Sequence, residues 1–313
     1  MRIVFMGTPD FALACLKPLT EAVCDRTLFD IAAVITQPDR PSGRGKRLQS
    51  PPVKDFALEM DIPVLQPEKI KSADSIAALE QLSADIFVVA AYGQILSRKI
   101  LDMPKYGAIN VHASLLPKYR GASPIQQAIA DGETVTGITI MQMDKGMDTG
   151  DMILKREIAI YAQDTGGTLH DKLCNLAPQA LLDALRLIAS GKAEREPQDN
   201  ASATYAPLIT KQMAHIDWHK SPKDIVNLIR AYNPFPGAFV RFGDDQIKIW
   251  RAETVDAIGA PGKIMQACPK DGIIVAALGG AVRIIELTPG GGKKMAAADF
   301  VRGHKIETGT ILK

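Results

Sequence analysis

The feature that most restricts the fold is an alternation of strand and helix patterns through the first half of the chain. Continuous apolar runs over residues 2–6, 29–35 and 85–91 predict strands that are buried on both faces. Helical spacing follows the first run and returns over residues 51–60 and 75–82. This alternation predicts an α/β fold with a doubly wound, mostly parallel, Rossmann-like sheet.

A further strand, over residues 108–112, carries two polar side chains where it ends. Asn110 and His112 fall on the same side of this strand because strand side chains repeat every two residues. Open α/β sheets bind ligands outside the carboxyl ends of their strands. Either residue alone is better explained as a hydrogen-bonding group at a strand end, so the pair needs a third partner to indicate a site.

The third partner is Asp148, in a glycine-punctuated loop over residues 144–151. Strands are expected on both sides of this loop, over residues 134–143 and 152–160. In a purely structural role, its Asp residues would simply suit a hairpin tip. In a functional role, Asp148 projects a carboxylate toward His112. The loop does not match the calcium-binding spacing DxDxDG, and we expect no metal there.

An amide, an imidazole and a carboxylate together suit transfer of an acyl-type group through a tetrahedral oxyanion. One donor such as Asn110 contributes roughly 3 kcal/mol to stabilising an oxyanion, and His112 can donate or move a proton. Ser114 lacks the strained GxSxG turn of an activated nucleophile, which favours direct transfer between two bound substrates. The absence of GxGxxG after the first strand makes a nicotinamide dehydrogenase a poor interpretation.

The second half of the chain predicts a separate domain. Apolar residues at helical spacing indicate a long helix over residues 165–190, and the polar run after it reads as a linker. Short apolar segments between Gly and Pro turns then predict a small, OB-like β-barrel in which only residues 222–232 are helical. We therefore expect a catalytic domain over residues 1–190, a linker over residues 191–207 and a β-barrel over residues 208–313.

Positive charge is concentrated in two places. The long polar stretch over residues 36–50 predicts a mobile loop outside the core, with Arg40, Arg44, Lys46 and Arg47 opposed only by Asp39. Such cations suit a phosphate backbone, although a solvated surface loop explains them equally well. Residues 206–313 carry 15 Lys and Arg against 10 Asp and Glu, whereas the remainder carries 22 against 25. This excess is a weak indication of a polyanionic partner.

The remaining composition indicates a cytoplasmic protein. Cys15, Cys24, Cys174 and Cys268 show no CxxC pairing, which is typical of free thiols in a reducing compartment. His215 and His219 have no further ligand type nearby, so no metal site is expected there. No segment reaches the roughly 18 apolar residues of a membrane span, so we expect no membrane association. Nothing in the sequence indicates a large exposed apolar face, and we therefore expect a monomer.

At the residues singled out above, the chain resembles the folate-dependent formyltransferases, whose pattern is Asn-x-His, then Ser-Leu-Leu-Pro, then a distal Asp. Longer segments of the sequence are similar to the branch of this family that acts on methionyl-tRNA. These segments are AINVHASLLPKYRGASPIQQAI, GITIMQMDKGMDTGDM, IVFMGTPDFA, TQPDRPSGRGK and NPFPGAF. The similarity covers nearly the whole chain. Two departures are Ala113, where many relatives carry Gly, and Tyr119, where Trp is frequent.

The resemblance implies a reaction and a set of site residues. It implies 10-formyltetrahydrofolate as formyl donor and the α-amino group of methionine on initiator tRNA as acceptor, with Asn110, His112 and Asp148 as the catalytic residues. It implies two segments lining the folate site, formed by Ser114, Leu115, Leu116 and Pro117 and by Ala91, Tyr92, Gly93 and Gln94. It also implies that the loop bearing Arg40, Arg44, Lys46 and Arg47 enters the tRNA acceptor stem, while the basic barrel holds the tRNA backbone.

Four alternatives remain at this point. An amino-sugar nucleotide N-formyltransferase shares the three catalytic residues but needs no polyanion-binding loop. A glycinamide ribonucleotide formyltransferase should lack a C-terminal domain of this length, and a formyltetrahydrofolate hydrolase needs no tRNA surface. A non-catalytic RNA-binding protein explains the basic regions but gives no reason for Asn110, His112 and Asp148 to converge.

Overall fold

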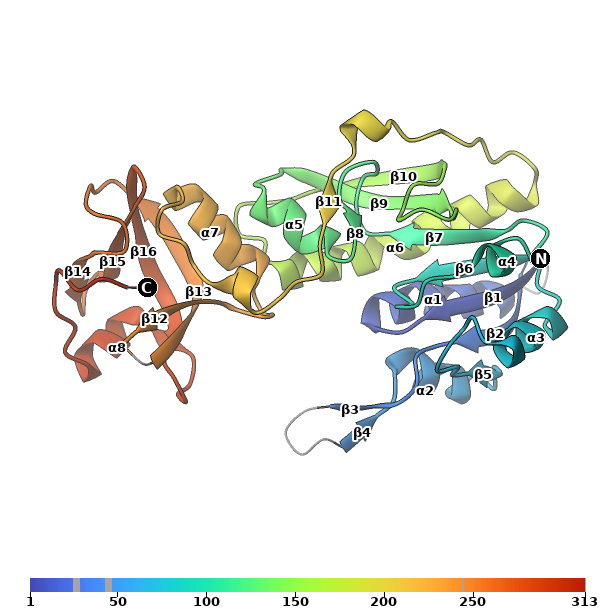
Figure 1. The fold of residues 1–313 in the computed structure, drawn as a ribbon, viewed down its shortest axis with the longest axis horizontal. Coiled ribbons are helices and arrows are strands. Elements are labelled where there is room, and N and C mark those ends of the chain that lie inside the picture. Colours follow the sequence, from blue (N-terminus) through green and yellow to red (C-terminus); the bar gives the residue numbers. More distant parts are fainter. Residues whose placement is uncertain (25–28, 43–46, 244, 313) are drawn as a thin grey trace. The chain divides into compact units, whose positions relative to one another are not determined.

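The computed structural model describes residues 1–24, 29–42, 47–243 and 245–312, and Arg44 and Lys46 lie outside the described residues. The chain folds into two compact units, each made of several segments (Figure 1). Unit 1 comprises Met1–Gly121, Thr136–Ile158 and His170–Tyr205. Unit 2 comprises Ala122–Val135, Ala159–Leu169 and Ala206–Lys313.

Unit 1 is built on a seven-stranded sheet with the strand order β10-β9-β7-β6-β1-β2-β5 (Figure 1). The pairs β1/β2, β1/β6, β6/β7 and β2/β5 are parallel, and β7/β9 is antiparallel. The predicted mostly parallel α/β sheet is therefore confirmed. Its strands are β1 (Arg2–Gly7), β2 (Asp30–Ile35), β5 (Val64–Leu65), β6 (Ile86–Ala90), β7 (Ala108–His112), β9 (Val135–Gln142) and β10 (Met152–Ala159).

Helices cover this sheet. Helix α1 contacts β1, β2 and β6, and α2 contacts β2 and β5. Val4 and Met6 of β1 belong to a buried cluster with Leu79 of α3 and Ile100 of α4, so these helices cover the face on which the even-numbered residues of β1 lie. The helices with residues in unit 1 are α1 (Asp10–Cys24), α2 (Pro52–Glu59), α3 (Ala73–Gln81), α4 (Arg98–Leu101) and α6 (Gly166–Ala189).

The sequence missed one helix of unit 1 and gave a wrong prediction for one polar stretch. The single-turn helix α4 has too few residues to produce a helical period, and the sequence did not indicate it. The polar stretch over residues 36–50, predicted as a loop, contains an antiparallel hairpin of β3 (Arg40–Ser42) and β4 (Arg47–Gln49). Pro41 lies inside this hairpin, and proline within a short polar run argues against a strand in sequence reasoning.

Unit 2 contains an antiparallel sheet with the strand order β12-β13-β16-β15-β14, and β17 pairs with β16. Among the described residues no pairing joins β14 to β12, so the structure shows an antiparallel sheet, and the closed OB-like barrel predicted for residues 208–313 is not confirmed. The strands are β12 (Ala238–Phe242), β13 (Asp245–Val255), β14 (Ile264–Cys268), β15 (Gly272–Ala277), β16 (Gly280–Thr288) and β17 (Met295–Ala296).

The helices of unit 2 are α5 (Pro124–Ala130), α7 (Pro222–Ala231) and α8 (Ala297–Gly303), with a 3₁₀ turn, η2 (Gln212–Ala214). The prediction that residues 222–232 form the only helix after the linker is wrong, because α8 is also helical. Ala297 and Phe300 of α8 are buried one turn apart, a pattern too short to stand out in the sequence. In the part of the chain that the structure describes, no helix combines the length and apolar character that a membrane crossing requires.

Candidate active site

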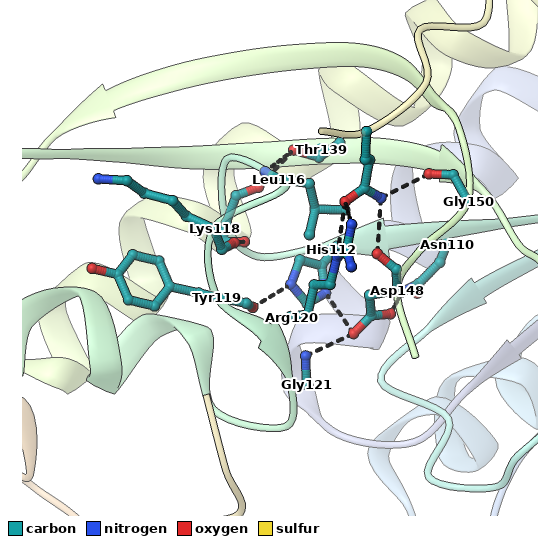
Figure 2. Close-up of polar contacts among 12 residues, drawn as sticks. Asn110, His112, Leu116, Lys118, Tyr119, Arg120, Gly121, Thr139, Asp148 and Gly150 are labelled. Atoms are coloured by element: carbon teal, nitrogen blue, oxygen red, sulfur yellow. Dashed lines mark hydrogen bonds and ion pairs between the residues drawn. The ribbon is translucent and has the colours of Figure 1, made fainter. Parts of the chain in front are cut away.

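The candidate site lies at the carboxyl end of β7 in unit 1. β7 is an apolar, buried strand in the middle of the sheet, and its alternation places Asn110 and His112 on one face. The loop between β9 and β10 brings Asp148 to the same place (Figure 2). Asn110 Nδ2 donates to Asp148 Oδ1 at 3.3 Å, and His112 Nδ1 lies 3.7 Å from Asp148 Oδ2. The structure thus brings together three side chains that the sequence selected from distant segments.

A backbone carbonyl orients the imidazole of His112. Nε2 of His112 lies 2.9 Å from the carbonyl oxygen of Tyr119, and the imidazole is buried. Because a carbonyl only accepts hydrogen bonds, the proton of a neutral His112 belongs on Nε2. Nδ1 of the neutral ring then carries no proton and lies 3.7 Å from Asp148 Oδ2, which is too far for a hydrogen bond. It can take up a second proton there.

The carboxylate of Asp148 is fixed from two sides. Besides the amide of Asn110, its Oδ2 atom accepts the N–H of Gly121 at 2.8 Å. The backbone of Asp148 is in the left-handed region at φ 53°, which a non-glycine residue keeps only when its surroundings hold it. Gln198 supplies such support, because its Nε2 atom donates to the carbonyl oxygens of Asp148 and Gly150 at 2.8 and 2.7 Å.

The Ser-Leu-Leu-Pro segment forms a tightly bonded turn after β7. The Ser114 hydroxyl is buried and donates to the carbonyl of Lys118 at 2.6 Å, so it is committed to the turn. Thr139 of β9 donates to Ser114 O at 2.7 Å and accepts the N–H of Leu116 at 3.1 Å (Figure 2). Leu116 is buried against Met141 and Met152, whereas Leu115 and Pro117 are partly exposed.

The other predicted folate segment follows β6, the strand next to β7. Ala91 and Gly93 are exposed and have positive φ angles, which expose the backbone of the turn. Gln94 joins the turn to residues 67–70, since its Oε1 accepts the N–H of Ile70 and its Nε2 donates to Pro67 O. Tyr92 is buried in the core, and burial raises the pKa of its phenol to about 12.

The predicted tRNA-binding cations lie in and beside the β3–β4 hairpin. Arg40 is exposed and its Nη2 atom pairs with Glu68 at 3.0 Å, while Arg47 is exposed on β4. Asp39, expected to oppose these cations, instead pairs with Lys54 at 2.7 Å. Hydrogen bonds from Gln66 and Lys54 lower the pKa of Asp39. Arg44 and Lys46 lie outside the described residues, so the structure gives no position for them.

Sequence reasoning missed several groups that hold the site. The carbonyl of Tyr119 and the N–H of Gly121 are backbone groups that every residue possesses, and no sequence signal distinguishes them. Thr139 is a polar residue between the apolar Ile138 and Ile140, which is a signal that could have been used.

The geometry favours acyl-type transfer over hydrolysis by an enzyme nucleophile. Asn110 provides an N–H donor, Asp148 an acceptor, and His112 Nδ1 a group that can hold or release a proton, all within one small volume. Ser114, the nearest hydroxyl of the turn, is not available as a nucleophile because its hydrogen bond goes to Lys118 O. Among the described residues, no group of three or more His, Cys, Asp or Glu side chains is arranged to hold a metal ion.

Comparison with known proteins agrees with this chemistry. Residues 1–185 match the formyl transferase family, and residues 208–305 match the formyl transferase C-terminal domain. The chain is 49% identical to a methionyl-tRNA formyltransferase from Caldanaerobacter subterraneus, and the match covers 100% of both chains. It is 46% identical to a protein of the same name from Acetivibrio thermocellus, over 100% of this chain and 99% of that one.

A solved structure shares the fold. The N-formyltransferase from Helicobacter canadensis, solved with folinic acid and dTDP-3-aminofucose, matches with a TM-score of 0.64 at 18% identity over 90% of this chain and 98% of that chain. The family matches and the full-length relatives confirm the resemblance to formyltransferases. The chain therefore belongs to the formyl transferase family.

Proposed function

We propose that this protein transfers the formyl group of 10-formyltetrahydrofolate to the α-amino group of methionine on initiator methionyl-tRNA, producing formylmethionyl-tRNA for translation initiation. The convergence of Asn110, His112 and Asp148 at the end of β7 carries the proposal for the chemistry. Full-length relatives named methionyl-tRNA formyltransferase, at 49% and 46% identity, support the choice of acceptor. Translation initiation is a cytoplasmic process, and we propose that location for the protein.

In this reaction the neutral amine attacks the formyl carbon, a new C–N bond forms, and the bond from the formyl carbon to the folate nitrogen breaks. Asn110 Nδ2 donates a hydrogen bond to the oxyanion that develops on the formyl oxygen. His112, held through Nε2 by Tyr119 O, stabilises the same charge when Nδ1 is protonated, and takes up and passes on a proton at Nδ1 when the ring is neutral. Asp148 accepts the proton that the attacking amine loses, directly or through His112, and the folate nitrogen takes up a proton as it leaves.

The formyl donor is proposed to bind between the two turns that follow β6 and β7. Ala91 and Gly93 offer exposed backbone groups that can recognise a flat, polar pterin ring. Leu115 and Pro117 add partly exposed apolar surface on the other turn. The hydroxyl of Ser114 and the side chains of Leu116, Tyr92 and Gln94 are packed or bonded within the protein, so their role is to shape these turns.

The tRNA is proposed to bind through the hairpin and the C-terminal domain. Arg40 and Arg47, together with Arg44 and Lys46, supply cations for the acceptor stem, and residues 208–313 supply an OB-like platform for the tRNA backbone. The net positive charge of residues 206–313 supports this assignment. We expect the protein to act as a monomer, with residues 1–190 as the catalytic domain and residues 191–207 as a linker.

The proposal is tested by offering the protein 10-formyltetrahydrofolate with two separate acceptors. Methionyl initiator tRNA is one acceptor, and an amino-sugar nucleotide, the acceptor of the alternative formyltransferase, is the other. Formylated product on the tRNA alone is the expected result. Product on the sugar alone would retain the catalytic residues but reject the tRNA assignment, and no product on either would reject the proposed reaction.

A further inference from the structure

The polar run after α6, expected to be a simple linker, crosses the candidate active site in unit 1. Near its start, the backbone of Glu196 pairs with that of Met152, the first residue of β10. Farther along, the backbone carbonyl of Thr204 accepts the N–H of Arg120 at 2.9 Å, and the Thr204 hydroxyl accepts the N–H of Tyr119 at 2.9 Å. Residues 196–204 thus pair with β10 and with the turn after β7, and Gln198 contacts the loop that carries Asp148.

Gln198 is the central residue of this crossing segment. Its side chain is buried, with the residue only 9% exposed, and its amide uses both of its ends. Nε2 donates to Asp148 O at 2.8 Å and to Gly150 O at 2.7 Å, while Oε1 accepts from Arg120 Nε at 3.0 Å and Nη2 at 2.8 Å. A guanidinium has only donors and a carbonyl only accepts, so this arrangement fixes which end of the amide faces which partner.

Arg120 anchors the amide of Gln198. Figure 2 shows Arg120 beside Asp148 and His112. Arg120 is 2% exposed, and its Nη2 atom also donates to Asn200 Oδ1 at 2.9 Å. The side chains of Gln198 and Asn200 accept these hydrogen bonds through neutral amide oxygens. A buried cation bonded in this way has little freedom to rotate, because a loss of these hydrogen bonds would leave its charge poorly solvated. Arg120 therefore holds Gln198 in one orientation.

The two carbonyls that Gln198 holds determine where the Asp148 carboxylate points. Asp148 has a left-handed backbone at φ 53°, and this conformation is disfavoured for a residue with a Cβ atom. Gly150, two residues on, packs closely against the backbone of Gln142, since a Cβ atom there would lie 1.8 Å from Gln142 O. With the flanking carbonyls fixed, the side chain of Asp148 is directed at Asn110 Nδ2 and Gly121 N–H.

We propose that Gln198 is a positioning residue for formyl transfer, whose amide, anchored by Arg120, holds Asp148 in the conformation that faces Asn110 and His112. This inference rests on the proposed function, because it assigns Gln198 to the same reaction. It also gives residues 196–204 a role in the active site rather than only a connecting role. Gln198 does not touch the reacting groups, so its effect on the reaction passes through Asp148.

The experiment compares two substitutions of similar size at this position. Gln198→Met removes the amide altogether. Gln198→Glu keeps a contact with Arg120 but presents acceptor oxygens to two carbonyls, so it keeps the fold through the Arg120 pair while pushing the Asp148 backbone away. Gln142 provides a matched control, because its Nε2 also bridges two carbonyls, Tyr106 O at 3.4 Å and Ala108 O at 2.9 Å, at the opposite end of β7. Gln142→Met and Gln142→Glu therefore remove the same kind of contact, an amide donor to two carbonyls, without changing the hydrogen bonds of Asp148 or Arg120.

Steady-state kinetics with 10-formyltetrahydrofolate and methionyl initiator tRNA separate the possible outcomes. Both Gln198 variants are expected to lower kcat roughly 10- to 100-fold with KM for either substrate changed by less than about threefold, since misplacement of a catalytic group acts mainly on the chemical step. The Gln142 variants are expected to lower the thermal unfolding midpoint and to keep the wild-type kcat. A Gln198 variant with wild-type kcat would overturn the inference.

A double-mutant cycle tests whether Gln198 acts through Asp148. In an Asp148→Asn background, Gln198→Met is expected to change the single-turnover rate by less than about threefold, because residues that act as one unit are not additive. The same fold loss in both backgrounds would reject the positioning role. Failure of the wild-type protein to formylate tRNA would instead reject the proposed function, so the two failures are distinguishable.

Discussion

The Nε2 atom of His112 lies 2.9 Å from the backbone carbonyl oxygen of Tyr119. Tyr119 itself has a left-handed backbone at φ 61°, which turns its carbonyl toward the imidazole. The orientation of the ring is therefore set by the main chain of the turn after β7, and Asp148 faces the other ring nitrogen at 3.7 Å. Nδ1 therefore makes no short hydrogen bond to the described residues and faces Asp148 at the proposed reaction centre.

The contact predicts the tautomer of His112. Because a carbonyl only accepts hydrogen bonds, neutral His112 is expected to carry its proton on Nε2 and none on Nδ1. Nitrogen-15 NMR of protein with labelled histidine measures which ring nitrogen is protonated, with His112→Gln used to assign the signal. A neutral ring protonated on Nδ1 would show that Asp148, rather than Tyr119, sets the orientation.

Thr139 is predicted to hold the turn that follows β7. Thr139→Val removes a buried hydroxyl that serves both Ser114 O and the N–H of Leu116. Leaving these groups unpaired is expected to lower the free energy of unfolding by about 1–3 kcal/mol. Thr139→Ser, which keeps the hydroxyl, is expected to lose less. Urea unfolding of the three proteins measures the difference, and equal stability of the Val and Ser variants would contradict the prediction.

Tyr92 is predicted to make stability depend on alkaline pH. Its hydroxyl has no hydrogen-bond partner among the described residues, and burial raises its pKa to about 12, compared with an ordinary value near 10. A raised pKa in the folded state means that the contribution of Tyr92 to stability is fully present below pH ~10 and is lost as pH rises toward ~12.

The substitution Tyr92→Phe isolates this contribution, because it removes the titrating group and keeps the ring. The free energy of unfolding of the variant is expected to fall less steeply than that of the wild type between pH ~10 and ~12. At neutral pH the variant is expected to be at least as stable, since no described hydrogen bond is lost. Parallel stability profiles for the two proteins over this range would rule out the assignment.

The hairpin cations are predicted to contribute unequally to tRNA binding. Arg40 is paired with Glu68 at 3.0 Å, whereas Arg47 lies exposed on β4 with no ion pair among the described residues. Arg47→Ala is therefore expected to weaken tRNA binding more than Arg40→Ala, and to reduce the slope of log K against log salt by about one. Filter binding at several salt concentrations measures both values, and equal effects would argue against the hairpin as the acceptor-stem contact.

The sequence predicted the parts of the fold that depend on long apolar patterns. β1, β6 and β7 are continuous buried runs, and α6 repeats its apolar positions over many turns. The helices α4 and α8 were missed because one or two turns leave too few positions to define a period. The β3–β4 hairpin was read as a loop because its strands are short and polar and one contains Pro41.

The candidate site was predictable where side chains carry it and unpredictable where the main chain does. Strand alternation grouped Asn110 with His112, and the glycine-punctuated loop pointed to Asp148. The groups that hold these three side chains include Tyr119 O and Gly121 N–H, which any residue could supply. Gln198 lies 50 residues from Asp148 in a polar run with no period, so only the fold reveals that it contacts the loop.

The most direct test of the central claim is the turnover number of Asp148→Asn for formyl transfer to methionyl initiator tRNA. Asn keeps the shape of Asp148 and an oxygen that can accept from Gly121 N–H, but it loses the acceptor for Asn110 Nδ2, so the thermal unfolding midpoint is expected to fall only slightly. Loss of the proton acceptor is expected to lower kcat roughly 10²- to 10⁴-fold. A folded Asp148→Asn protein with wild-type turnover would contradict the assignment of Asn110, His112 and Asp148 as the catalytic residues.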